Sequence, residues 1–255
     1  MSSAPTPPPD ARRVVLVTGA NRGIGLAAVA GLARLGHTVL LGSRSLERGR
    51  EAAEPLRADG LDVRPIGVDV TDDDTVSAAV AAIAAEHGRL DTLVNNAAIK
   101  LEMAPAPPSR SRLEIVRKTF ETNVFGTIRV TLAMIPLLHL SAAPRIVNVS
   151  SGLGSLTLAT TAGTKYQARP MLSYNPSKAA INSIAVQFAN ELGEAGFKVN
   201  VADPGYTNTE MTRPDANRGG TRTPEEGAAV VVRLATLPDD GPNGGFFDDG
   251  GPVPW

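Results

Sequence analysis

From Val14 onward the chain alternates short runs of Val, Leu and Ile with longer alanine-rich segments, and this alternation limits the possible fold most. The first six runs are almost continuously apolar, which is typical of strands buried on both faces. We expect seven strands, over Val14–Val17, Thr38–Leu41, Val63–Val68, Thr92–Val94, Arg145–Val149, Lys198–Val201 and Phe246–Phe247. Alternating strands and helices predict an α/β fold with a doubly wound, mainly parallel seven-stranded sheet and helices on both faces.

Helical patterns fill the gaps between these runs. The expected helices cover Ile24–Leu35, a segment after Thr71–Asp74, Arg112–Leu138, Tyr174–Gly193 and a segment after Thr223. Asp and Thr residues before the second helix can cap it, and its early acids suit the helix dipole. Thr223 is expected to be the N-cap of the last helix, because Pro224 suits the first helical position.

The length of 255 residues fits one α/β domain, which we place at residues 14–255. Residues 1–13 are rich in Pro, Ser and Ala and lack the apolar region of a signal peptide, so they are expected to form a disordered tail. No apolar stretch in the sequence is long enough to span a bilayer. We therefore expect a cytoplasmic protein.

The balance of charge and the absence of cysteine exclude several classes of function. With 25 basic and 26 acidic residues, the net charge is −1, so neither nucleic acid nor a membrane is an expected partner. Without cysteine there can be no disulfide, thiolate nucleophile or Cys-zinc site. His37, His87 and His139 stand apart from one another, and no metal site is expected.

Three glycines follow the first strand in the segment Thr18–Gly25, with the spacing Gly-x-x-x-Gly-x-Gly. Without Cβ atoms the chain can turn sharply, and backbone amides can approach a pyrophosphate at the N-terminus of the following helix. A tight turn without a ligand is the alternative. The position between the first strand and the first helix favours a Rossmann-type dinucleotide site.

Tyr174 and Lys178 are four residues apart at the start of a predicted helix, which places both side chains on one face. A free tyrosine has a pKa of about 10, and a neighbouring ammonium, helped by an oxidised nicotinamide, would lower it. The pair then forms an acid/base group. A surface Tyr and Lys on an amphipathic helix is the alternative.

These features occur in one order along the chain, and together they resemble the short-chain dehydrogenase/reductase family, specifically its NADP(H)-preferring carbonyl reductases. The resemblance runs from Val14 onward through Thr18–Gly25, Asp69, Asn95–Ala98, Asn123, Ser150-Ser151, Tyr174 with Lys178, and Pro204-Gly205. It implies a nicotinamide cofactor and a small-molecule carbonyl or alcohol substrate. It also implies a homodimer or homotetramer.

The resemblance implies a catalytic group of four residues, Asn123, Ser151, Tyr174 and Lys178. Ser151 would hydrogen-bond the substrate oxygen, with Ser150 as the alternative if the alignment shifts by one. Asn123 would hold a water that relays protons to Lys178. Tyr166 also lies between Ser151 and the helix, but Pro170 stands where a lysine would have to be.

The resemblance likewise implies a set of cofactor contacts. These are Gly19, Asn21, Arg22, Gly23, Ile24 and Gly25 in the turn, Arg44, Asp69 and Val70, Asn96, Ala97 and Ala98, Tyr174 and Lys178, and Pro204, Gly205, Thr207 and Thr209. Ala98 replaces the glycine usual in the family, and its methyl group can crowd the cofactor.

Arg44 indicates which nicotinamide cofactor is used. An NAD(H) enzyme of this fold usually carries an acid at the end of the second strand, where this chain has Gly42–Ser45. A guanidinium pairs with a 2′-phosphate, and Arg22 could reach the same group. Solvated surface charges are the alternative, and NADP(H) is favoured over NAD(H).

The substrate side of the site is less defined by the sequence. Residues 156–170 lengthen the chain between Ser151 and Tyr174 and are expected to form a loop near the substrate entrance, and Glu210 to about Gly220 resembles a lid. An apolar or aromatic carbonyl would fit a pocket containing Leu153, Tyr166, Tyr206 and Met211. Trp255 could dock into a neighbouring subunit, cap the pocket or fold back.

We thus expect an NADP(H)-dependent oxidoreductase that transfers a hydride between nicotinamide and a ketone, aldehyde or secondary alcohol. The alternatives are an epimerase or dehydratase of the same fold and a non-enzymatic NADP(H)-sensing protein.

Overall fold

The computed structural model describes residues 12–102, 107–212 and 220–255. Most of the expected N-terminal tail and residues 213–219 of the expected lid lie outside these ranges, so the domain boundaries remain a prediction. Within the described chain, no helix is both long and apolar enough to cross a bilayer. The described residues contain no group of three or more His, Cys, Asp or Glu side chains that could hold a metal ion.

One eight-stranded sheet forms the centre of the molecule, in the order β3-β2-β1-β4-β5-β6-β7-β8. The strands are β1 (Val14–Val17), β2 (Thr38–Ser43), β3 (Val63–Gly67), β4 (Thr92–Asn95), β5 (Arg145–Val149), β6 (Lys198–Ala202), β7 (Phe246–Asp248) and β8 (Gly251–Pro252). The strands β1 to β7 pair in parallel, as expected from the alternating pattern. The eighth strand pairs antiparallel with β7 and was not predicted, because two residues of Gly and Pro carry no strand pattern.

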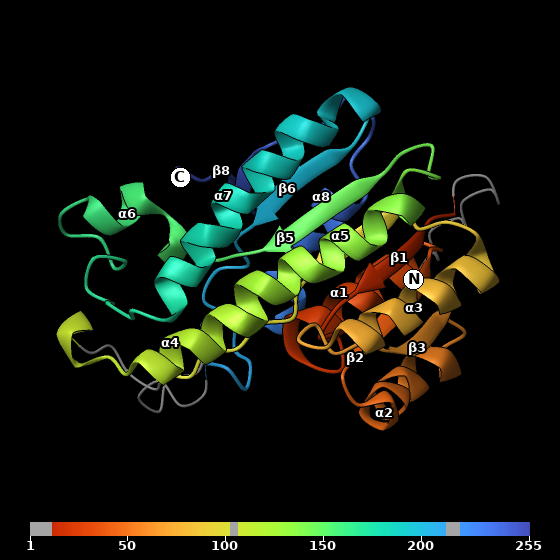
Figure 1. Cartoon of the computed structure of the whole chain (residues 1–255), viewed down its shortest axis with the longest axis horizontal. Coiled ribbons are helices and arrows are strands. Elements are labelled where there is room, and N and C mark those ends of the chain that lie inside the picture. Colours follow the sequence, from red (N-terminus) through yellow and green to blue (C-terminus); the bar gives the residue numbers. More distant parts are fainter. Residues whose placement is uncertain (1–11, 103–106, 213–219) are drawn as a thin grey trace.

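Helices cover both faces of the sheet (Figure 1). One face carries α1 (Gly23–Arg34), α2 (Leu46–Ala58) and α8 (Pro224–Ala235). The other carries α3 (Asp73–His87), α5 (Gly126–Leu138) and α7 (Tyr174–Leu192). The central strands β1, β4 and β5 are buried along their whole length, which explains their continuous apolar runs.

The caps of two helices agree with the sequence-based expectation. Asp72 caps α3 by accepting hydrogen bonds from the backbone amides of Asp74 and Thr75. Thr223 caps α8 in a capping box with Glu226, and Pro224 is the first residue of the helix. These local hydrogen bonds satisfy amides that have no partner inside the helix.

The single helix expected over Arg112–Leu138 is divided in the structure. A helix α4 (Leu113–Phe120) leads into a π-helical turn, Glu121–Phe125, and then into α5. The turn contains Asn123, and π turns of this kind often occur at functional sites. The spacing of apolar residues cannot show this change in winding, because the residues on both sides of the π turn still have helical spacing.

The segment of residues 156–170 was expected to be a loop, but it begins with a short helix, α6 (Leu156–Thr160). The C-terminal residues lie against the start of this segment. The backbone amide of Thr157 donates to the carbonyl of Trp255 at 2.8 Å, and the Ser155 hydroxyl donates to Pro254 at 2.6 Å. The Trp255 ring stacks on Phe246 with centroids 5.5 Å apart, so Trp255 folds back on its own domain.

Candidate active site

The ends of β1 and β4 meet through the hydroxyl of Thr18, which follows β1. This buried oxygen accepts hydrogen bonds from the backbone amides of Asn96 and Ala97, both at 3.1 Å. The Asn96 side chain donates in turn to the carbonyls of Thr18 and Gly19, at 2.9 and 3.1 Å. The glycine turn and the segment Asn96–Ala98 are therefore held as one unit, so the structure brings these predicted cofactor residues together.

The glycine turn itself has little room for side chains. Gly19 and Gly23 have φ values of 61° and 56°, a left-handed conformation that favours glycine. A Cβ atom at Gly25 would lie 2.4 Å from the Asn96 side-chain nitrogen, so α1 packs closely against the end of β4. Asn21 and Ile24 complete the turn and the start of α1, and both are half-buried.

The N-terminus of α1 is suited to an anion. Arg22 is at the N-cap position, but no side chain caps the helix there, and its first turn contains no acid. The amides of a first helical turn point outward and carry partial positive charge. The turn thus fits a pyrophosphate, as the glycine spacing predicted.

The two arginines expected near a 2′-phosphate differ in their surroundings. The guanidinium of Arg22 forms an ion pair with Glu210 from the segment after β6. Arg44 directly follows β2, is exposed, and has no ion pair or side-chain hydrogen bond with any described residue. Arg44 is therefore the better placed of the two to receive a phosphate.

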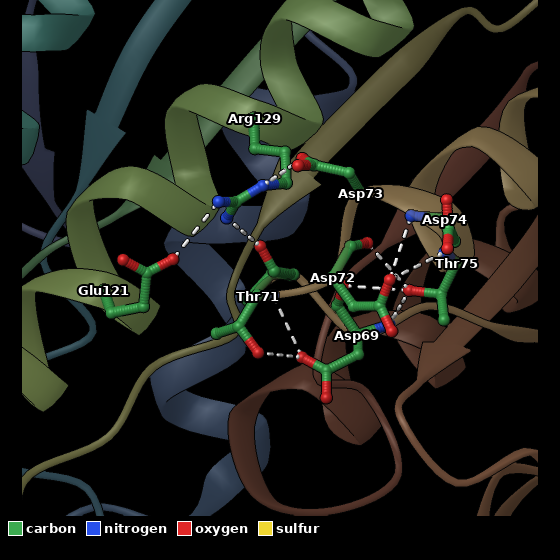
Figure 2. Close-up of polar contacts among 9 residues, drawn as sticks. Asp69, Thr71, Asp72, Asp73, Asp74, Thr75, Glu121 and Arg129 are labelled. Atoms are coloured by element: carbon green, nitrogen blue, oxygen red, sulfur yellow. Dashed lines mark hydrogen bonds and ion pairs between the residues drawn. The ribbon is translucent and has the colours of Figure 1, made fainter.

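The predicted adenine contacts, Asp69 and Val70, follow β3 and are fixed by hydrogen bonds (Figure 2). One carboxylate oxygen of Asp69 accepts hydrogen bonds from the Thr71 amide and hydroxyl at 2.9 and 2.8 Å. The other oxygen has no partner among the described residues. Arg129 donates to the Val70 carbonyl at 2.7 Å and also pairs with Glu121 and Asp73, which ties this segment to α5.

The turn after β6 lies beside the glycine turn. The methyl group of Thr209 would be 3.2 Å from a Cβ atom at Gly23, so the two turns are in contact. The buried Thr207 hydroxyl donates to the carbonyl of Pro204 at 3.1 Å, and the Gly205 amide donates to Asp203 at 3.0 Å. The four predicted cofactor residues of this turn therefore lie at the same sheet edge as Gly19–Gly25.

Tyr174 and Lys178 occupy the first two turns of α7, and both side chains are buried, with 9% and 2% of their surface exposed. The Lys178 ammonium nitrogen lies 5.6 Å from the centroid of the Tyr174 ring. It donates to the carbonyl of Val149, the last residue of β5, at 2.9 Å. The helix thus places both groups at the end of the fifth strand.

The two serines after β5 point to different neighbours. Ser151 is half-buried and lines the same cleft as Tyr174, and its hydroxyl oxygen accepts a hydrogen bond from the Leu153 amide at 3.2 Å. Ser150 is buried, and its hydroxyl donates to Asn182 of α7 at 2.6 Å. Of the two serines, only Ser151 lines the cleft together with Tyr174. The geometry therefore favours Ser151 over Ser150 as the residue that contacts a substrate oxygen.

Burial shifts the pKa values of the Tyr–Lys pair in ways that the sequence did not indicate. The pKa of Lys178 falls to about 8, because burial disfavours its charged form. The pKa of Tyr174 is raised by burial and by the nearby charge of Asp203, while its hydrogen bond with Ser151 acts in the opposite direction. The expectation of a lowered Tyr174 pKa is therefore wrong for the protein by itself, since desolvation and Asp203 outweigh the stabilisation of the phenolate.

Asn123 is fully buried in the π-helical turn between α4 and α5. Its side-chain oxygen accepts from the Ile99 amide at 2.8 Å, and its side-chain nitrogen donates to the Ile99 carbonyl at 3.0 Å. The same nitrogen donates to the Ser177 hydroxyl of α7 at 3.0 Å. Asn123 thus connects the segment after β4 with the helix that carries Tyr174 and Lys178.

Two carboxylates beside Tyr174 were not singled out from the sequence. Glu102 accepts hydrogen bonds from the amide and hydroxyl of Ser173 and from the Tyr174 amide, at 2.7 to 3.2 Å, and so caps α7 from a distant segment. Asp203 is buried at the end of β6, and burial raises its pKa, while backbone amides of Gly205 and Gly152 stabilise its charge. An acid directly before Pro204-Gly205 was the only available signal for Asp203, and none marked Glu102.

A cleft of about 320 Å³ opens beside the phenol. Ser151, Tyr174 and Asp203 line it, together with all four residues expected in the substrate pocket, Leu153, Tyr166, Tyr206 and Met211. Lys165 and Arg169 also line it, so the segment of residues 156–170 borders the substrate side as expected. Tyr166 forms part of the wall of the cleft. The cation over its ring is Lys165, which does not belong to α7.

Comparisons with known proteins agree with this geometry. The sequence pattern of the family described as short chain dehydrogenase matches residues 13–218. The short-chain dehydrogenase anuI of Penicillium roqueforti is 36% identical over 229 residues, covering 88% of each protein. Human NADPH carbonyl reductase 1 is 34% identical over 274 residues, covering 92% of this chain and 96% of the relative.

Among solved structures, salutaridine reductase from Papaver somniferum superimposes with a TM-score of 0.78 at 31% identity, covering 93% of this chain and all of that one. The family match covers most of the chain, and the relatives share its fold over nearly their whole length. The chain therefore belongs to the short-chain dehydrogenase family and is an oxidoreductase that acts on carbonyl or alcohol groups.

Proposed function

We propose that this protein reduces a ketone or aldehyde with NADPH, and that Tyr174 is the proton donor. The observation that carries the proposal is that the hydroxyl-bearing side chains of Tyr174 and Ser151 line one cleft together. Two hydroxyl groups converge there, which is the arrangement needed to bind and protonate one carbonyl oxygen. The phenol is protonated at neutral pH, since the pKa of an ordinary tyrosine is about 10 and burial raises that of Tyr174 further.

The cofactor, when bound along the glycine turn, supplies the hydride. The chain's own groups act on the substrate oxygen. Ser151 donates a hydrogen bond to it, Tyr174 transfers its proton to the developing alkoxide, and the Lys178 ammonium stabilises the resulting phenolate. Asn123 and Glu102 hold the N-terminal part of α7 in place through Ser177 and the Ser173–Tyr174 backbone.

The preference for NADP(H) rests on Arg44. An exposed guanidinium without a partner among the described residues stands at the end of β2, and no acid occupies Gly42–Ser45. A dianionic phosphate would form charge-assisted hydrogen bonds with this group. The human relative is named as an NADPH enzyme, which agrees with this assignment.

We also propose that the protein is a homodimer or homotetramer that assembles through the α4–α5 side of the molecule. Leu113, Phe125 and Leu132 have 60%, 52% and 56% of their surface exposed on these helices. Exposed large apolar side chains on one continuous helical segment, here α4, the π turn and α5, are typical of an interface between proteins.

Replacing Tyr174 with Phe removes the transferable proton and keeps the ring. We expect kcat for carbonyl reduction to fall by at least about 100-fold, the usual contribution of general acid catalysis, with an unchanged Kd for NADPH. Tyr166→Phe is the matched control, because it removes the hydroxyl of the other cleft tyrosine, and it should retain most activity. A Tyr174→Phe enzyme with a kcat close to that of the wild type would refute the assignment.

Replacing Arg44 with Ala removes the proposed phosphate contact. We expect the Kd for NADPH to rise by about tenfold or more, as for a lost charge-assisted hydrogen bond, and the Kd for NADH to stay within about twofold. Calorimetric titration measures both. Arg34→Ala, with the same change of charge in the last turn of α1, is the control and should change neither value.

The rate of reduction should depend on the charge of Lys178. Because burial lowers its pKa to about 8, Lys178 is cationic below that pH and neutral above it. We therefore expect kcat for reduction to decrease as pH rises through about 8, and this limb of the profile to disappear in Lys178→Met. A wild-type kcat that stays constant up to pH 10, where an unburied lysine would begin to titrate, contradicts this expectation.

Analytical ultracentrifugation at micromolar concentration tests the proposed assembly. We expect a dimer or tetramer for the wild type and a shift towards monomer when Phe125 and Leu132 are both replaced by Lys, because buried lysines oppose association. A monomeric wild type at these concentrations would contradict the proposal.

A further inference from the structure

The cleft beside Tyr174 combines an apolar body with a cationic rim. Leu153, Met171 and Met211 form part of its apolar wall, and Tyr166 and Tyr206 contribute aromatic rings. The cations Lys165 and Arg169 come from the segment of residues 156–170 and line the same cleft. No described residue of the glycine turn lines it, although Gly205 of the turn after β6 and a third cation, Lys100, do. The two cations of residues 156–170 therefore share a cleft with the substrate residues and not with the predicted pyrophosphate turn.

Arg169 differs from the other arginines of comparable burial. In the described parts of the chain, each of the other half-buried or buried arginines donates to a carboxylate or to backbone carbonyls, as Arg129 and Arg145 do. The half-buried Arg169 guanidinium forms neither contact with any described residue. A cation in a cleft without an acidic partner is suited to an anion from outside the protein.

Aromatic rings hold both cations at the cleft. The Arg169 guanidinium carbon lies 5.0 Å from the centroid of the Tyr206 ring, and the Lys165 nitrogen lies 5.0 Å from that of Tyr166. Tyr166 is itself fixed against the backbone, since a Cβ atom at Gly152 would be 2.6 Å from its ring. A guanidinium within this distance of a ring keeps its N–H donors free to pair with a carboxylate.

The acid of the cleft sets the orientation of a charged substrate. Asp203 is buried at the end of β6, close to Tyr174, and accepts hydrogen bonds from the Gly205 and Gly152 amides. An anionic group near Tyr174 would be repelled by this carboxylate, whereas one near Arg169 would be attracted. The charge of Lys165 acts on Asp203 and lowers the pKa of this acid, so Lys165 is partly balanced within the cleft and Arg169 is the main attraction for an anion. The carbonyl end of a substrate can then lie at Ser151 and Tyr174 while its anionic end lies at Arg169.

We propose that the substrates of this enzyme are carbonyl compounds that carry a carboxylate on an apolar or aromatic body, with the carboxylate bound by Arg169 and attracted by Lys165. This inference rests on the proposed function for the carbonyl end of the substrate. The anion site itself can be tested without turnover, by measuring the affinity of the protein for an anionic ligand.

Binding of two probes of the same shape tests the anion site directly. Benzoate and its neutral counterpart benzamide are titrated calorimetrically into the protein with NADPH present. We expect benzoate to bind more tightly than benzamide, and Arg169→Gln to raise the Kd of benzoate by about tenfold or more while leaving benzamide within about twofold. Arg34→Gln is the matched control and should change neither. Equal binding of the two probes, no binding of either, or a benzoate affinity that survives Arg169→Gln would overturn the proposal.

Turnover separates this inference from the proposed function. The substrates are 4-carboxybenzaldehyde and the methyl ester of the same acid, which has no charge. We expect a lower KM for the carboxylate, and loss of this preference in Arg169→Gln with little change in kcat for the ester. Turnover of both aldehydes without an Arg169-dependent preference contradicts the anion site alone. Arg169-dependent benzoate binding without turnover of either aldehyde supports the anion site and contradicts the proposed reduction.

Discussion

Parallel pairing of β1, β4, β5 and β6 brings the carboxyl ends of four central strands to one edge of the sheet. The candidate active site depends on that edge, because Thr18, Asn96, Ser151 and Asp203 follow these strands within two residues and α7 brings Lys178 to the end of β5. The Thr18 hydroxyl joins two of these segments, and Lys178 reaches the end of a third through the Val149 carbonyl. A parallel sheet thus gathers residues from distant parts of the chain without any covalent link.

The helix α7 is held at its N-terminus by groups from outside the helix. Glu102 accepts from the Ser173 and Tyr174 amides, and Asn123 donates to the Ser177 hydroxyl. Both anchors come from segments that follow or flank β4, the strand whose end also lies against the glycine turn. The glycine turn and the start of α7 are therefore each hydrogen-bonded to the segment of residues 96–102 after β4, which favours a fixed geometry between them.

Burial determines the protonation of the central groups more than their mutual contacts do. Removing Tyr174 and Lys178 from water disfavours the charged form of each, so the phenol becomes a weaker acid and the ammonium a stronger one. Asp203 adds to the first effect, since a second negative charge near the phenol would be repelled. A protonated phenol in the same cleft as Ser151 matches the needs of carbonyl reduction, and the cations Lys165 and Arg169 line that cleft as well.

By itself, the sequence determined the order of strands and helices, the glycine turn and the Tyr174–Lys178 pair. Each of these depends on spacing along a single element or turn, and apolar periodicity and glycine content report such spacing directly. The seven parallel strands were predicted for this reason. The strand β8 and the helix α6 escaped, because they are too short to carry a pattern. The helix α2 (Leu46–Ala58) was also absent from the expected helices.

Only the tertiary structure decided which side chains face one another across segments. It placed Ser151 in the cleft and turned Ser150 towards Asn182. It brought Glu102 to the start of α7 and placed Asn123 in a π turn. It also paired Arg22 with Glu210, whereas Arg44 has no partner among the described residues. It also reversed the expected pKa shift of Tyr174. Desolvation and contacts between distant residues depend on how the folded chain excludes water, and no local pattern in the sequence encodes that exclusion.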